Sequence, residues 1–163
     1  MPYRVCFVCT GNICRSPMAE HVFRARVTEA GLADAVVVDS AGTGGWHEGD
    51  GADPRTVAVL EEGGYGSEHT ARRFRASWFA ALDLVIALDE GHVRELRRLA
   101  RTPEEAAKIR LLRSYDPGAG ADLDVPDPYY GGRDLFEECL EMVEAASEGL
   151  LAAVRDEVEE RTA

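Results

Sequence analysis

Short apolar runs rich in β-branched residues alternate with helical patterns along this chain, and this alternation restricts the folds that it can adopt. Four such runs predict strands: Arg4–Val8, Val36–Val38, Leu84–Leu88 and Ile109–Leu112. Strands that alternate with helices form right-handed crossovers, which build a parallel sheet covered by helices. The pattern predicts an α/β fold, a doubly wound, four-stranded parallel sheet flanked by helices on both faces. A length of 163 residues suits a single domain over residues 1–163.

Helical periodicity between the predicted strands identifies the helices that would cover the sheet. One helix opens at Pro17 and ends at Gly31, and it would bury four apolar residues on one face: Met18, Val22, Phe23 and Val27. Further helices are predicted over 54–62, 89–101 and 135–158. Each pair of consecutive strands is therefore joined through a helix, as a parallel sheet requires.

The segment between the first strand and the first helix has the composition of a phosphate-binding loop. It runs Val8-Cys9-Thr10-Gly11-Asn12-Ile13-Cys14-Arg15-Ser16-Pro17. Gly11 and Asn12 tolerate unusual backbone angles, while Ser16 is placed as a helix N-cap and Pro17 as the first helical residue. Backbone N–H groups of such a loop and helix start point at one spot, where the helix dipole adds partial positive charge. The sequence therefore predicts a phosphate-binding loop directly after the first strand.

Cys9 and Arg15, separated by five residues, would give this loop its chemistry. A guanidinium binds two oxygens of a phosphate at once. Cations and helix N-termini lower the pKa of a cysteine from about 8.5 to roughly 3.5–7.5, so Cys9 is expected to present a thiolate to the phosphorus. The spacing alone would be weak evidence, because a buried cysteine is often a small apolar residue. The surrounding strand, loop and helix favour a cysteine-dependent phosphatase.

The carboxyl ends of the predicted strands should lie on one edge of the sheet, where ligands bind in folds of this class. This rule brings together Cys9–Arg15, Asp39–Trp46, Asp89 and the segment 114–132. The last segment has no helical or strand pattern, and loops longer than about 12–15 residues are usually functional or disordered. Its three prolines favour a shaped wall of the site over disorder.

Asp127 is the candidate general acid, because prolines on both sides fix its backbone. When a phenol is displaced from phosphorus, an acid that protonates the departing oxygen typically accelerates the reaction by about 10²–10⁴-fold. In a second step, the same carboxylate, now ionised, would activate water to hydrolyse the phosphocysteine. Asp116, Asp122 and Asp124 remain alternatives within this segment, and Asp127 could also be a structural turn residue.

Three aromatic residues, Trp46, Tyr129 and Tyr130, lie in the loops at this edge. Aromatic residues are often part of the core, but these three stand among glycines and charged residues. We interpret them as walls of a cleft that accepts an aryl group. A deep cleft would let a phosphotyrosyl ring reach the thiolate, whereas phosphoserine would be too short.

Charge and cysteine usage exclude several classes of partner and location. The formal net charge of −12 argues against nucleic acid or an anionic membrane as a partner. No apolar run approaches the ~20 residues that a membrane span needs, and there is no signal-peptide pattern. The four cysteines, Cys6, Cys9, Cys14 and Cys139, show no secreted disulfide framework. We therefore expect a cytoplasmic protein with reduced thiols.

The sequence resembles the low-molecular-weight protein tyrosine phosphatases over nearly its whole length. The resemblance rests on the run 9–17 and on Asp127-Pro128-Tyr129-Tyr130. Weaker matches lie between them, namely Ser40-Ala41-Gly42, Trp46, Asp53-Pro54-Arg55 and His69-Thr70-Ala71-Arg72. The resemblance implies a two-step mechanism through a phosphocysteine intermediate, without metal or cofactor. Its expected substrates are a phosphotyrosine-containing protein or a small aryl phosphate.

The resemblance also implies a role for each matched residue. Cys9 is the nucleophile, Arg15 binds the phosphate, and Asp127 is the acid and then the base. The remaining loop residues bind phosphate or support the loop: Thr10, Gly11, Asn12, Ile13, Cys14 and Ser16. Ser16 would donate to the thiolate, and Asn12 would hold the loop in a strained shape, tied to Ser40 and His69. No acid–base role is expected for His69.

Cys14 matches the family pattern, whereas the end of the third strand departs from it. The family's second loop cysteine implies a reversible Cys9–Cys14 disulfide that protects the nucleophile from over-oxidation, although Cys14 could simply pack the loop. The family often has an asparagine shortly after the aspartate that ends the third strand. Here the sequence is Asp89-Glu90-Gly91-His92, which departs from that pattern.

Two other functions compete with phosphatase activity. Arsenate reductases use a similar loop on the same kind of sheet, but they need further thiols, and no cysteine stands between Cys14 and Cys139. A phosphotyrosine-binding module without activity would need the arginine but neither the thiolate nor the acid. Nucleotide binding is disfavoured because neither glycine-rich nucleotide motif is present.

Overall fold

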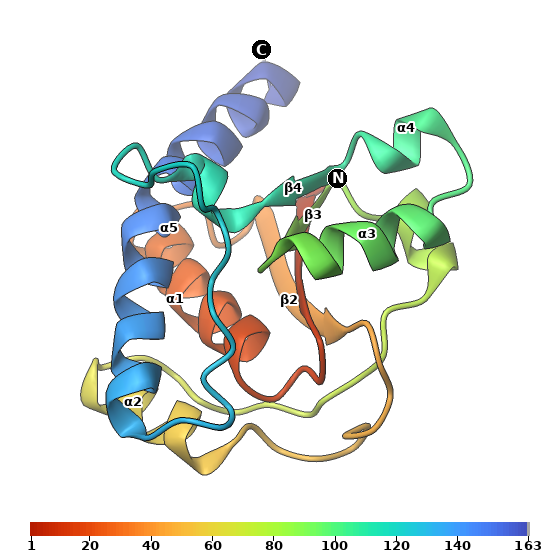
Figure 1. Cartoon of the computed structure of the whole chain (residues 1–163). Coiled ribbons are helices and arrows are strands. Elements are labelled where there is room, and N and C mark those ends of the chain that lie inside the picture. Colours follow the sequence, from red (N-terminus) through yellow and green to blue (C-terminus); the bar gives the residue numbers. More distant parts are fainter. Residues whose placement is uncertain (163) are drawn as a thin grey trace.

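Four parallel strands form the sheet at the centre of the molecule, whose computed structural model describes residues 1–162 (Figure 1). They are β1 (Tyr3–Cys9), β2 (Val36–Gly42), β3 (Leu84–Ala87) and β4 (Ile109–Leu111), in the spatial order β2-β1-β3-β4. Both neighbours of β1 run parallel to it, and β4 is parallel to β3. The predicted α/β fold with a four-stranded parallel sheet is confirmed.

Helices cover both faces of this sheet. The α-helices are α1 (Arg15–Glu29), α2 (Pro54–Glu62), α3 (Glu90–Leu99), α4 (Pro103–Ala106) and α5 (Arg133–Thr162). Two short 3₁₀ helices, η1 (Ala76–Ala80) and η2 (Leu112–Tyr115), complete the connections. Figure 1 shows α1 and α5 side by side on one face of the sheet and α3 on the other.

Each face of the sheet has its own hydrophobic core, because side chains alternate along a strand. In β1, Val5 and Phe7 are fully buried against the helices α1, α2 and α5. Their neighbours Cys6 and Val8 are fully buried on the opposite face, with η1 and α3. Because β1 is covered on both faces, its sequence is a nearly continuous apolar run.

The start of α1 differs from the prediction. The helix begins at Arg15, and its N-cap is Cys14, which makes no side-chain capping bond. Ser16 is therefore not the N-cap, and Pro17 is the third helical residue, where its missing N–H removes no intrahelical bond. The preceding loop explains this difference, because other contacts hold its backbone. The chain therefore enters the helix without a capping side chain.

Other boundaries differ by a few residues. The prediction for α2 is confirmed, and Asp53 caps it by accepting from the backbone N–H of Arg55. β2 continues to Gly42 because it pairs with β1 as far as Cys9, and α5 extends beyond both predicted ends. The sequence prediction missed η1, η2 and α4, because segments of four or five residues are too short to show a period. No helix among residues 1–162 combines the length and apolar character that crossing a membrane requires.

Candidate active site

The loop between β1 and α1 lies at the carboxyl edge of the sheet, at a central strand. Asn12 adopts a left-handed backbone conformation with a φ of 58°, which asparagine tolerates better than most residues. Its fully buried side chain donates from Nδ2 to Oγ of Ser16 at 2.8 Å and to Oγ of Ser40 at 2.9 Å, while Oδ1 accepts from the backbone N–H of Arg72 at 3.0 Å. Side-chain contacts from three segments therefore fix the strained residue.

Two further residues support Asn12 from outside the cavity. Nε2 of His69 donates to the carbonyl oxygen of Asn12 at 2.5 Å, and burial lowers the pKa of His69. Ser40, which accepts from Asn12, donates its own proton to Glu20 at 2.5 Å, and Glu20 in turn accepts from Arg24. The structure thus brings together the predicted Asn12, Ser40 and His69 contacts and adds Glu20, which the sequence prediction missed.

Gly42 allows the end of β2 to pass close to the loop. A Cβ at this position would lie 2.7 Å from the carbonyl oxygen of Thr10 and 3.1 Å from the backbone nitrogen of Asn12. Beyond the strand, the backbone N–H of Thr43 donates to the carbonyl of Cys9 at 2.8 Å. The loop is therefore packed backbone to backbone against β2, and a side chain at Gly42 would separate them.

Cys9 lies at the base of the loop, with 2 % of its surface exposed. Its Sγ is 2.9 Å from Oγ of Ser16. Oγ of Ser16 accepts from Asn12, and its own proton has two acceptors within reach, the Cys9 sulfur at 2.9 Å and the more distant carbonyl oxygen of Ala41 at 3.4 Å. Ser16, although not the helix N-cap, thus occupies the place expected of a donor to the thiolate.

Arg15 is buried at the first position of α1 and binds two groups through Nη1. One is Oδ2 of Asp89, at 2.8 Å, and the other is the carbonyl oxygen of Val125, also at 2.8 Å. Burial opposes the charge on this guanidinium, but the Cys9 sulfur and the carboxylates of Asp89 and Asp127 outweigh it and raise the pKa of Arg15. Arg15 therefore stays charged beside Cys9.

Asp127 faces Arg15 from the segment before α5, and its side chain is 47 % exposed. Oδ2 lies 3.7 Å from Nη2 of Arg15, while Oδ1 accepts from the backbone N–H of Tyr129 at 3.1 Å. Of the four aspartates considered in this segment, Asp127 lines the cavity above Cys9. The other three each bind a backbone N–H: Asp116 that of Gly118, Asp122 that of Asp124, and Asp124 that of Glu90.

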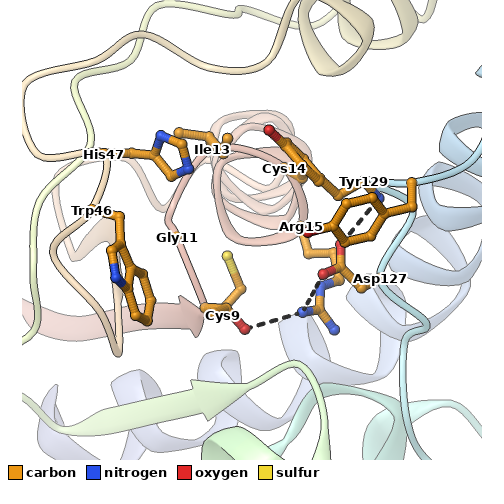
Figure 2. Close-up of a pocket in the computed structure, with 11 residues that line it drawn as sticks. Cys9, Gly11, Ile13, Cys14, Arg15, Trp46, His47, Asp127 and Tyr129 are labelled. Carbon is orange, nitrogen blue, oxygen red and sulfur yellow. Dashed lines mark hydrogen bonds and ion pairs between the residues drawn. The ribbon is translucent and has the colours of Figure 1, made fainter.

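The cavity itself has a volume of about 240 Å³ and opens between aromatic side chains. It is lined by the loop residues Cys9, Thr10, Gly11, Ile13, Cys14 and Arg15, and by Trp46, His47, Asp127, Tyr129 and Tyr130. Figure 2 shows Trp46 on one side of Cys9, with Asp127 and Tyr129 on the other. Trp46 is 75 % exposed and Tyr130 95 %, so neither belongs to the core.

His92 is a buried site residue whose role the sequence prediction missed. Its Nδ1 accepts from the backbone N–H of Asp89, so Nε2 carries the proton and donates to Oγ1 of Thr10 at 2.9 Å. Burial and the nearby Arg15 guanidinium lower the pKa of His92 to about 4. Asp89 and His92 form a capping box at the start of α3. In the sequence, the role of His92 is indicated by its position three residues after Asp89, at the start of a helical pattern.

Cys14 also lines the cavity, and all four cysteines are free thiols. Burial, reinforced by Asp53, raises the pKa of Cys14 to about 12. At neutral pH, Cys14 is therefore a protonated thiol. A disulfide with Cys9 would require it to lose that proton first.

Comparison with known proteins gives the chain its family. Residues 4–160 match the family model described as low molecular weight phosphotyrosine protein phosphatase. The chain belongs to this family. The resemblance inferred from residues 9–17 and 127–130 is thereby confirmed.

Individual relatives of this phosphatase family match over nearly the whole chain. A low molecular weight protein-tyrosine-phosphatase of Streptomyces coelicolor is 76 % identical, covering 100 % of both chains. Low molecular weight protein-tyrosine phosphatase A of Mycobacterium tuberculosis is 50 % identical over 99 % of this chain and 95 % of its own. A crystal structure of a protein tyrosine phosphatase from Entamoeba histolytica superposes with a TM-score of 0.90, at 33 % identity, covering 94 % of this chain and 97 % of that one.

Proposed function

We propose that this protein hydrolyses phosphotyrosine through a phosphocysteine intermediate, with Cys9, Arg15 and Asp127 as its catalytic residues. The observation that carries the proposal is the meeting of these three side chains at one cavity. Arg15 lies beside Cys9 in the loop, and Asp127 approaches from a distant segment to within 3.7 Å of Arg15. A nucleophile, a phosphate-binding cation and an acid within reach of the same cavity are the groups that this reaction needs.

In the first step, the thiolate of Cys9 attacks phosphorus while Arg15 and the N–H groups at the start of α1 bind the phosphoryl oxygens. The sulfur–phosphorus bond forms as the bond from phosphorus to the tyrosine oxygen breaks. Asp127, protonated at this stage, gives its proton to the departing oxygen, so the product leaves as a neutral phenol. The first N–H groups of α1, which no side chain caps, suit this binding of an anion.

In the second step, Asp127 acts as the base. Its carboxylate takes a proton from a water molecule, whose oxygen forms a bond to phosphorus as the bond to sulfur breaks. Inorganic phosphate is released and Cys9 returns to its thiolate. The hydroxyl of Ser16, 2.9 Å from Sγ, stabilises that leaving thiolate by donating to it.

The preference for an aryl phosphate is supported by the side chains at the cavity mouth. Trp46, Tyr129 and Tyr130 line it together with Ile13, so a phenyl ring would find apolar and aromatic surface on its way to Cys9. The shorter side chain of phosphoserine would not carry its phosphate past these residues. Small aryl phosphates would fit the same cavity.

The proposed chemistry requires a reduced Cys9, which suits the cytoplasm. The four free cysteines are compatible with that compartment. The acidic net charge of −12 supports a protein or small-molecule substrate over nucleic acid.

The test is hydrolysis of a phosphotyrosine peptide, a phosphoserine peptide and p-nitrophenyl phosphate, in the presence of EDTA and dithiothreitol. We expect turnover of the two aryl phosphates by the parent and none by Cys9→Ser. Asp127→Asn should lower kcat/KM by about 10²-fold or more for phosphotyrosine and by less for p-nitrophenyl phosphate, because nitrophenolate leaves without protonation. Asp124→Asn, the matched control, should stay close to the parent.

Two results would overturn the proposal. If the reduced parent binds the phosphotyrosine peptide without turning it over, the protein is a binding module. If it turns over neither aryl phosphate but consumes arsenate with a thiol reductant, it is an arsenate reductase.

A further inference from the structure

The segment that carries Asp127 has its backbone carbonyls bound by arginines instead of by a sheet or helix. Nη1 of Arg113 donates to the carbonyl oxygens of Asp122 and Asp124, at 3.0 and 2.8 Å. Nη1 of Arg15 donates to that of Val125, at 2.8 Å. Farther along, Arg55 binds two more carbonyls of the same segment. A stretch without regular secondary structure is thereby held at several points.

Arg55 binds the segment directly after Asp127. Its Nη2 donates to the carbonyl oxygen of Tyr129 at 2.9 Å and its Nη1 to that of Gly131 at 2.8 Å. Because Arg15 holds Val125, two residues before Asp127, and Arg55 holds Tyr129, two residues after it, the aspartate is fixed from both sides. Arg15 is needed for the phosphate, so Arg55 is the anchor whose role can be tested separately.

The guanidinium of Arg55 is held by Asp53, the N-cap of α2, and by Phe136 of α5. Asp53 accepts from Nε of Arg55 at 3.1 Å and from its Nη2 at 3.0 Å. The guanidinium also lies over the ring of Phe136, 4.3 Å from its centroid. Nε, Nη1 and Nη2 all donate, and the planar group stacks on an aromatic face, so its orientation is well determined.

Asp53 connects this anchor to the phosphate-binding loop. Its backbone N–H donates to the carbonyl oxygen of Ile13 at 2.8 Å. A continuous series of short contacts therefore runs from the loop at Ile13, through Asp53 and Arg55, to the carbonyl of Tyr129. This series joins the phosphate-binding loop to the segment that carries Asp127, and neither Asp53 nor Arg55 lines the cavity.

We propose that Arg55 is a positioning residue that sets the distance between the general acid Asp127 and the nucleophile Cys9. The inference rests on the proposed function, since it assigns Arg55 to the acid step of that reaction. Arg55 does not touch the reacting atoms. Displacements of about 1 Å in such a geometry can lower a rate by about 10²-fold, and the loss should fall on reactions that depend on proton donation.

The test compares leaving groups in the variant Arg55→Gln. Gln keeps a donor but cannot bind two carbonyls and Asp53 at once. The readout is kcat/KM, which reports the steps up to release of the phenol and leaves out the later hydrolysis of the phosphocysteine. We expect kcat/KM for phenyl phosphate and a phosphotyrosine peptide to fall by about 10–100-fold, and kcat/KM for p-nitrophenyl phosphate by less than about threefold. Arg133→Gln is the matched control, because Arg133 contacts Glu62 and Glu137 and none of these carbonyls. It should leave all three rates close to those of the parent.

A double-variant cycle separates positioning from a general structural role. If Arg55 acts through Asp127, then adding Arg55→Gln to Asp127→Asn should lower kcat/KM for the phosphotyrosine peptide by less than about twofold further, because the two changes remove the same contribution. Additive losses in kcat/KM, or equal losses in kcat/KM on every leaving group, would overturn the inference while leaving the proposed function intact. Failure of the parent to turn over any aryl phosphate would instead overturn the proposed function.

Discussion

His92 should make the stability of this protein depend on pH, and replacing it should remove that dependence. An unfolded histidine has a pKa of about 6.5, whereas burial and Arg15 lower the pKa of His92 to about 4. Between these values, the unfolded chain binds a proton that the folded protein excludes, so stability falls as the pH falls. At 1.36 kcal/mol per pH unit, the loss from His92 is about 2 kcal/mol between about pH 7 and about pH 5.

The assay is urea unfolding of the parent and of His92→Gln at both pH values. The variant loses hydrogen bonds to Thr10 and Asp89 and so should be less stable at about pH 7. Its further loss on acidification should nevertheless be smaller than that of the parent by about 2 kcal/mol. His47→Gln controls for the removal of a histidine from a partly exposed position. Equal losses for parent and His92→Gln would show that His92 does not exclude the proton, and the reasoning from its burial would be wrong.

Three further predictions concern the loop. Gly42→Ala places a Cβ 2.7 Å from the carbonyl of Thr10. It should lower the free energy of unfolding, measured with urea, by about 1–3 kcal/mol. Unchanged stability would contradict the close packing. Ser16→Ala should slow hydrolysis of the phosphocysteine by about tenfold or more, giving a p-nitrophenol burst in stopped flow; a steady-state rate equal to the parent's would exclude the role. After mild peroxide treatment, Cys14→Ser should recover less activity in dithiothreitol than the parent does. Recovery as full as that of the parent would refute protection of Cys9 by Cys14.

The parts of the fold that the sequence predicted are those determined locally. Buried parallel strands need apolar residues at nearly every position, so β1 and β3 stand out as short runs. The phosphate-binding loop was equally accessible, because Cys9 and Arg15 belong to one continuous segment. The helix α2 was predicted with both boundaries because Asp53-Pro54 at its start and Gly63-Gly64 at its end are strong local indications.

Residue patterns alone did not reveal contacts between distant segments, and the Asn12 contacts with Ser40 and His69 were expected only from the family resemblance. Ser16 was predicted from local spacing as an N-cap, which it is not, whereas its contact with Cys9 was expected only from the family resemblance. Arg55 and Glu20 resemble ordinary helix residues, since neither has a neighbour that indicates a carbonyl or serine partner far along the chain. His92 was noticed as a departure from a family pattern, but its burial became visible only in three dimensions.

The parallel topology explains why so many unrelated segments support one loop. Because all four strands end at the same edge, the loop after β1 is flanked by the ends of both neighbouring strands. Asn12 is held from the β2 side by Ser40, and Thr10 is held from the β3 side by His92. These supports act on the loop, whereas Asp127 lies on a segment beyond β4 that Arg113 and Arg15 hold before the aspartate and Arg55 holds after it. Arg55 holds this segment from α2 without lining the cavity, so its loss should affect proton transfer, while loss of Ser40 or His92 should affect phosphate binding.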